Sequence, residues 1–298
     1  MIRKALEVLP GVQKWCVEFG AWDGRLASNT HRLMAEEGWS GVLIEGNSAR
    51  YRDLQRTYAG NPRAVCVNEM VEMEGPRSLD RILGQTGAIP YDFDLVSIDT
   101  DGLDYHLWSA FTAYHPKIVV IEFNPTIPID IEFVQRADAT VHQGSSLAAI
   151  TRLGKEKGYE LVATSDVNAF FVDRDLYPAF AIDDNSLAAI RADRSYETRV
   201  FQLFDGTLCW EGCTELLWHG VKFSQPQVLP RPLRWLPGTE PTLARRAARR
   251  LYVELARRIT RSPGANVAFA EKADGLPAVE SAATAHAQLG RLDAEEDH

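Results

Sequence analysis

This 298-residue sequence lacks the features of a secreted or membrane-spanning protein. Its four cysteines, Cys16, Cys66, Cys209 and Cys213, are too few for a disulfide framework in a chain of this length. It has no run of about 18 apolar residues, and its first residues lack the uninterrupted apolar stretch of a signal peptide. The sequence therefore favours a cytoplasmic protein without a transmembrane segment.

Positive charge is also scarce. The chain has 32 lysines and arginines against 41 aspartates and glutamates, which gives a formal net charge of -9. Nucleic-acid binding depends on clustered basic residues, so this balance argues against a nucleic-acid partner. Hydrophobic residues make up 45% of the chain, which is enough for the core of one large α/β domain with a smaller appendage.

Short apolar runs alternate with helix-like segments in the first part of the chain. This alternation predicts βαβ units and an α/β fold with a Rossmann-like, doubly wound, mostly parallel sheet. The expected strands are residues 15–19, 41–45, 64–68, 95–99, 118–123, 160–164 and 169–172. The expected helices are residues 29–37, 48–58, 78–83, 105–113 and 146–157. A turn-like sequence at residues 165–168 separates the last two strands, which should therefore form a C-terminal antiparallel hairpin.

The pattern changes after Pro178, and we predict four parts of the chain. They are an α/β domain over residues 1–178, a β-rich extension with a proline-rich linker over 179–240, a basic helix over 241–262, and a disordered tail over 263–298. The extension contains strand-like runs at 198–203, 206–210 and 215–218, and Asp205-Gly206 between the first two is a hairpin turn signal.

The basic helix has an apolar stripe beside seven arginines and a single glutamate, Glu254. The residues of the stripe recur every four positions: Leu243, Ala247, Leu251, Leu255 and Ile259. We expect this stripe to pack on the chain's own domain or against a second copy in a homodimer, and an acidic membrane surface is the alternative.

A glycine-bearing turn follows the first expected strand, but the full G-x-G-x-x-G pattern of dinucleotide folds is absent. Glu18 is followed by Gly20, Trp22 and Gly24, and Glu45 ends the second strand. An acidic side chain there can accept hydrogen bonds from the hydroxyls of an adenosine ribose. Trp22 would crowd a pyrophosphate on this turn, whereas S-adenosyl-L-methionine has no phosphate. The residues favour an S-adenosylmethionine-dependent methyltransferase; an NAD(P)-dependent oxidoreductase and a non-catalytic nucleotide-binding module are the alternatives.

With these motifs the chain resembles the FkbM-type S-adenosylmethionine-dependent methyltransferases, a class I, Rossmann-like family. The matching segments are residues 17–24 (VEFGAWDG), 43–45 (LIE), 97–104 (SIDTDGLD), 158–159 (GY) and 168–172 (NAFFV). The resemblance implies O- or N-methyl transfer to a small molecule, often a sugar or natural product. We predict that the cofactor contacts Glu18, Gly20, Ala21, Gly24, Glu45, Asn68, Glu69 and Asp99. Residues 180–298 have no counterpart, and Glu45-Gly46-Asn47 departs from the family's proline-containing turn.

Acidic and amide side chains follow the fourth and fifth expected strands. Asp99 and Asp101 should lie on one side of their segment, as should Glu122 and Asn124, because side chains alternate along a strand. These oxygens would suit Mg²⁺. The arrangement resembles catechol-type O-methyltransferases, although Phe123 separates the last two ligands. The alternative is that the aspartates cap the following helix.

Transfer to a hydroxyl acceptor needs a base or a metal within hydrogen-bond reach. The candidate catalytic residues are His142, His106 and Asp99. His106 follows the carboxylates directly, whereas His142 lies in a Gly/Ser-rich segment of the kind that closes over substrates. We favour His142 as the base.

Overall fold

The computed structural model describes residues 1–87, 89–224, 227–234 and 242–260. Contacts divide the chain into two units. The first comprises Met1–Leu203 with Leu208–Gln227, and the second comprises Phe204–Thr207 with the residues from Val228 onward. The candidate site residues all belong to the first unit.

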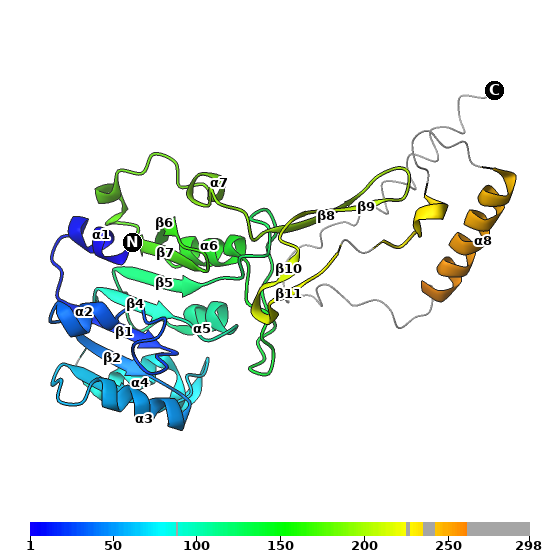
Figure 1. Cartoon of the computed structure of the whole chain (residues 1–298). Coiled ribbons are helices and arrows are strands. Elements are labelled where there is room, and N and C mark those ends of the chain that lie inside the picture. Colours follow the sequence, from blue (N-terminus) through cyan, green and yellow to red (C-terminus); the bar gives the residue numbers. More distant parts are fainter. Residues whose placement is uncertain (88, 225–226, 235–241, 261–298) are drawn as a thin grey trace. The chain divides into compact units, whose positions relative to one another are not determined.

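The first unit is built on a seven-stranded sheet with the order β3-β2-β1-β4-β5-β7-β6 (Figure 1). The strands are β1 (Trp15–Phe19), β2 (Ser40–Ile44), β3 (Ala64–Val67), β4 (Leu95–Ile98), β5 (Ile118–Glu122), β6 (Tyr159–Thr164) and β7 (Asn168–Asp173). Strands β1 to β5 pair in parallel, and β7 is antiparallel to both of its neighbours. The predicted mostly parallel sheet and its C-terminal hairpin are confirmed.

The α-helices of the first unit are α1 (Ile2–Val8), α2 (His31–Glu36), α3 (Ser48–Thr57), α4 (Leu79–Thr86), α5 (Asp104–Ala110), α6 (Leu147–Glu156) and α7 (Leu187–Ile190). Helices α2 to α6 connect strands of this sheet, whereas α1 precedes its first strand and α7 follows its last (Figure 1). Side-chain caps fix three of the starts, including that of α7, where Ser186 accepts the N–H of Ala189. The side chain of Asn47 accepts hydrogen bonds from the backbone N–H groups of Ala49 and Arg50, and that of Ser146 accepts one from Ala149, which satisfies N–H groups that a helix leaves unpaired.

Two hydrophobic clusters form the core, and strand alternation assigns neighbouring residues to different clusters. Val17 and Phe19 of β1 belong to one cluster with Trp108, whereas Cys16 belongs to the other with Leu33. The central strands are buried on both faces, which explains their nearly continuous apolar sequences. The core therefore fixes the ends of β1, β2, β4 and β5 as a rigid edge.

The chain after β7 contains two small antiparallel pairs. Strands β8 (Thr198–Gln202) and β9 (Leu208–Gly212) pair with each other, as do β10 (Glu215–Leu216) and β11 (Val221–Lys222). The third predicted strand, 215–218, is shorter than expected because a 3-10 turn, Leu217–His219, replaces its second half.

In the second unit, helix α8 spans Leu243–Thr260, close to the predicted range. None of the described helices is long and apolar enough to cross a membrane. The predicted tail, 263–298, and residues 235–241 of the predicted linker lie outside the described residues.

Candidate active site

The candidate site lies where the parallel strands β1, β2, β4 and β5 end. Parallel strands bring their carboxyl ends to one edge of a sheet, and open α/β sheets bind ligands there. Glu45 follows β2, Asp99 follows β4, and Glu122 is the last residue of β5. The fold therefore gathers side chains that are far apart in the sequence.

Gly20 lets the turn after β1 pass directly against the end of β4. Its φ is +75°, and a Cβ at this position would lie 1.7 Å from the carbonyl oxygen of Asp99. The next residue, Ala21, is buried and donates its N–H to the carbonyl of Ile44 at 3.1 Å. The close approach of the Asp99 carbonyl therefore requires glycine at this position, and the predicted cofactor contact of Gly20 stays a prediction. Gly24 ends the turn by donating its N–H to the carbonyl of Ala21 at 2.8 Å.

Glu18 is buried, and the residues just before α2 engage its carboxylate. Its Oε1 accepts the Asn29 N–H at 2.7 Å, and its Oε2 accepts the hydroxyls of Ser28 at 2.6 Å and Thr30 at 2.7 Å. Burial raises the pKa of Glu18, and these hydrogen bonds oppose the rise. Glu18 thus fastens the segment 28–30 to β1, a role that differs from the predicted cofactor contact.

The Glu45 carboxylate holds the turn after β1 and still has unused hydrogen-bond acceptor positions. Its Oε2 accepts the Trp22 N–H, and its Oε1 accepts the Asn47 N–H, each at 2.7 Å. A carboxylate has about four acceptor positions, so about two remain. Asn68 donates to the Glu45 carbonyl at 2.7 Å and accepts the Ser48 hydroxyl at 3.0 Å. The next residue, Glu69, is exposed.

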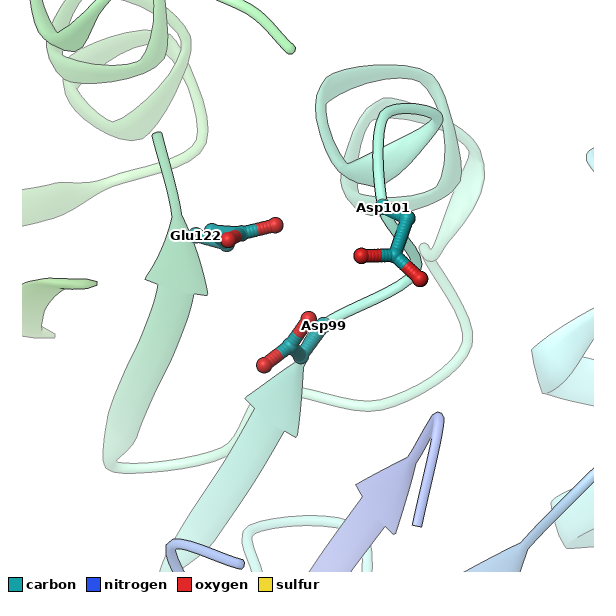
Figure 2. Close-up of side chains that lie close together, drawn as sticks. All are labelled: Asp99, Asp101 and Glu122. Atoms are coloured by element: carbon teal, nitrogen blue, oxygen red, sulfur yellow. The ribbon is translucent and has the colours of Figure 1, made fainter. Parts of the chain in front are cut away.

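Asp99, Asp101 and Glu122 converge in one carboxylate cluster (Figure 2). Each offers an oxygen that lies within 4.8 Å of the others. Asp99 and Glu122 are half-buried, whereas Asp101 is exposed and has a φ of +56°. Among the described residues, this is the one group of histidine, cysteine or acidic side chains with the spacing of a metal site.

The cluster has an unusual affinity for protons. Burial, reinforced by the neighbouring carboxylates, raises the pKa of Asp99 to about 7 and that of Glu122 to about 8. Removing a charged carboxylate from water is unfavourable, and so is a second negative charge close by. Near neutral pH the cluster therefore retains a proton, which a bound cation would displace.

Asp104, the first residue of α5, holds the loop that precedes this helix, and no side chain caps the start of the helix. Its side chain is buried and accepts hydrogen bonds from the Thr100 N–H and hydroxyl and from the Gly102 N–H. It thereby closes the loop between β4 and α5. Asp99 and Asp101 are not required as caps, and their carboxylates remain turned towards the cluster.

Asn124 does not join the carboxylates. Its Oδ1 accepts the N–H of Thr126 at 3.0 Å and the hydroxyl of the same residue at 2.7 Å, and its Nδ2 donates to the Gln143 carbonyl. An amide oxygen has two lone pairs, and both are used. The set of candidate metal ligands is therefore reduced to the three carboxylates.

The two candidate histidines differ in what their rings contact. The Nε2 of His106 lies 2.7 Å from the Gln135 carbonyl and must donate to it. The Nδ1 of exposed His142 lies 3.1 Å from the Asp101 carbonyl. Donation from this Nδ1 leaves the Nε2 lone pair of His142 available as a base. His142 lies beside the carboxylate cluster, whereas His106 supports the segment that carries Gln135.

Gln135, which the sequence did not single out, organises the loop that carries His142. It is 1% exposed, and its Oε1 accepts the N–H groups of Gln143 and Gly144 while its Nε2 donates to the Val141 carbonyl. A Cβ at Gly102 would lie 2.6 Å from this Oε1, so the side chain also packs against the loop after β4. Only the tertiary contacts reveal this role.

No family model matches the chain, and no curated protein matches it. Similar solved structures include an O-methyltransferase (NcsB1) from neocarzinostatin biosynthesis in complex with S-adenosyl-L-homocysteine and 1,4-dihydroxy-2-naphthoic acid, with 15% identity and a TM-score of 0.36 over 54% of this chain and 49% of that one. An O-methyltransferase family protein from Burkholderia thailandensis matches with 10% identity and a TM-score of 0.38 over 54% of this chain and 51% of that one.

The CMeT domain of the citrinin polyketide synthase matches with 11% identity and a TM-score of 0.38 over 58% of this chain and 50% of that one. The chain thus spans about half the length of these structures. Similarity at this level carries no conclusion about the activity of this chain.

Proposed function

We propose that this chain is an S-adenosylmethionine-dependent methyltransferase that acts on a small-molecule acceptor. The observation that carries the proposal is Glu45. Its carboxylate lies at the carboxyl end of β2, is 8% exposed, holds the turn after β1, and keeps acceptor positions for the ribose hydroxyls of an adenosine. The strand order of the sheet and the resemblance to the FkbM-type family support the same function.

The residues around Glu45 fit an adenosine without a phosphate. Trp22 is 41% exposed, and the guanidinium of Arg50 lies 4.1 Å from the centre of its ring. A bulky side chain here leaves little room for the pyrophosphate of a dinucleotide. Asn68 and Glu69, which follow β3, lie next along this edge of the sheet and complete the proposed adenosine contacts. S-Adenosylmethionine, when bound, supplies an electrophilic methyl group on a sulfonium.

The carboxylate cluster and His142 would act on the acceptor. A hydroxyl becomes a good nucleophile when a base takes its proton as the oxygen–carbon bond forms. A base with a pKa near the working pH is effective, and the pKa of Asp99 is raised to about 7. Asp99 would accept the proton, and Glu122 and His142 would position the hydroxyl by hydrogen bonds.

The same carboxylates could instead hold Mg²⁺. Asp99, Asp101 and Glu122 offer hard oxygen ligands at a common spacing, and Mg²⁺ usually keeps several waters besides a few carboxylates. A bound cation would lower the pKa of an acceptor hydroxyl, so that no protein base would be needed. The three carboxylates fit such an ion, but Asn124 does not.

The proposed acceptor is a hydroxyl of a sugar or natural product, as the family resemblance suggests. The test is formation of S-adenosylhomocysteine from S-adenosylmethionine by the purified full chain, with panels of sugars, phenols and amines. Acceptor-dependent product supports the proposal. If no acceptor in these panels gives S-adenosylhomocysteine and the same protein reduces or oxidises a nicotinamide, the result would favour an oxidoreductase instead.

A further inference from the structure

Helix α8 carries an apolar stripe that the described residues of its own unit leave exposed. Leu243, Leu251 and Leu255 are 83%, 63% and 49% exposed, and Ala247, between them at the same spacing, is also exposed. Residues four apart lie on one side of a helix, so these side chains form a continuous strip. The described residues of the second unit therefore leave this strip uncovered.

The helix contacts its own unit through residues other than the leucines. The Tyr252 hydroxyl donates to the Val228 carbonyl at 2.7 Å, and Arg245 donates to the Arg234 carbonyl at 2.8 Å. Tyr252 and Arg245 are half-buried. With 100° of rotation per residue, they lie roughly opposite Leu243, whereas Leu255, three residues after Tyr252, lies beside it at the other end of the stripe. The packing of α8 within its unit is therefore satisfied without the leucines.

Basic side chains flank the exposed stripe. Arg246, Arg250 and Arg258 are exposed, and the one acidic residue of the helix, Glu254, is 3.4 Å from Arg258. The helix contains six arginines, whereas the whole chain has a formal net charge of -9. Basic residues beside an apolar strip are complementary to a surface that carries anionic groups and has an apolar layer just beneath them.

We propose that α8 binds the surface of an anionic lipid bilayer, with its leucines in the acyl boundary and its arginines at the headgroups. A helix of 18 residues is about 27 Å long and could lie in this interface without spanning it. A nucleic acid would satisfy the arginines but would leave the leucines in water. This proposal does not depend on the proposed methyltransferase activity.

The first test is co-sedimentation of the full chain with vesicles of phosphatidylcholine alone or with about 30% phosphatidylglycerol. Binding is expected only to the anionic vesicles and should weaken as salt is added, because salt screens the attraction. Leu251→Glu and Leu255→Glu should each reduce the partition coefficient at least about tenfold, since each places a charge in the apolar boundary. Leu216→Glu is the matched control, because Leu216 and Leu255 are each 49% exposed. This variant should bind the vesicles as the original chain does.

The second test separates the contribution of charge. Each basic residue near an anionic surface strengthens binding about fivefold, so the double variant Arg246→Gln/Arg250→Gln should bind about 25-fold more weakly. Arg32→Gln/Arg56→Gln removes the same charge from the exposed ion pairs of α2 and α3 and should not change binding. Helicity and thermal unfolding confirm that each variant is folded.

Two outcomes would overturn the proposal. The first is that the full chain fails to sediment with anionic vesicles at low salt, or that the α8 variants sediment like their controls. The second is that the full chain is a dimer by sedimentation velocity that Leu251→Glu converts to a monomer, while vesicle binding is absent. The stripe would then be a contact between two copies of this chain.

Discussion

The most informative residue is Glu122, because its pKa of about 8 connects the site to stability. An unfolded glutamate has a pKa of about 4.3, so between these values the folded chain binds more protons than the unfolded chain. The free energy of unfolding must therefore fall as the pH rises through this range. The ionised Glu122 side chain therefore lowers the free energy of unfolding. This effect is absent at low pH and is complete above the pKa of Glu122 in the folded chain.

Glu122→Gln should relieve this destabilisation, because glutamine resembles the protonated acid. In buffer containing EDTA, we expect the variant to exceed the original chain in free energy of unfolding by on the order of 1–2 kcal/mol at pH 8, after allowance for solvent screening. The two proteins should be equally stable near pH 4.5. Denaturant titrations at both pH values check this, and Glu74→Gln, at an exposed acid outside the cluster, is the control. A variant that is less stable at pH 8 would refute the electrostatic account.

Gly20 provides a second residue-scale prediction. Gly20→Ala places a Cβ against the Asp99 carbonyl and should lower the free energy of unfolding by roughly 2–4 kcal/mol, from backbone strain and overpacking together. Gly60 has a similar φ of +80° and nothing within 4 Å of a Cβ, so Gly60→Ala isolates the strain. Equal destabilisation of the two variants, measured by thermal or denaturant unfolding, would show that the contact with Asp99 is unimportant.

Some residue roles could be predicted from the sequence because they follow from the ends of strands. Glu45, Asp99 and Glu122 lie at the predicted edge, since each directly follows or ends a buried apolar run. The partners of Glu18 and Asn124 could not be predicted in this way. Their hydrogen bonds depend on how a loop folds back, and no spacing in the sequence specifies that path.

At the scale of elements, the strands of the sheet were predicted to within one residue at each end. Parallel strands that are buried on both faces have nearly continuous apolar sequences, and this signal is strong. Helix α1 was not predicted: none of its residues is fully buried, and its short apolar face, Ile2, Ala5 and Leu6, is only partly buried against the core. The start of α5 was misplaced by one residue, because Asp104 both begins the helix and caps the preceding loop.

The loop between β5 and α6 is the element on which the proposed chemistry depends. It carries Gln135 and His142, and Gln135 holds it against the loop after β4. If His142 is the base, His142→Ala should lower turnover by about 10²–10⁴-fold without a change in cofactor affinity. If Asp99 is the base, Asp99→Asn should lower turnover by a similar factor instead, and it should also remove the rise of rate with pH near 7. Rate profiles from pH 5 to 9 separate the two, and unchanged turnover in both variants would exclude both residues.

At the scale of the whole molecule, the presence of a metal decides which mechanism operates. If the three carboxylates hold Mg²⁺, activity should be lost in EDTA and should return when Mg²⁺ is added, and Glu122→Gln should be partly rescued by more Mg²⁺. If they instead retain a proton, activity should be insensitive to EDTA. Steady-state assays before and after chelation distinguish these cases, with Glu74→Gln as the charge-matched control.

The most direct test of the central claim is isothermal titration calorimetry of the full chain with S-adenosylhomocysteine and, separately, with NADH. We predict one-to-one binding of S-adenosylhomocysteine and no binding of NADH. Glu45→Gln should weaken that binding by about 10- to 150-fold, because a charged hydrogen bond is worth roughly 1.5–3 kcal/mol, whereas Glu36→Gln on the exposed face of α2 should not. Binding of NADH instead, or an unchanged affinity in a folded Glu45→Gln protein, would contradict the assignment of this site.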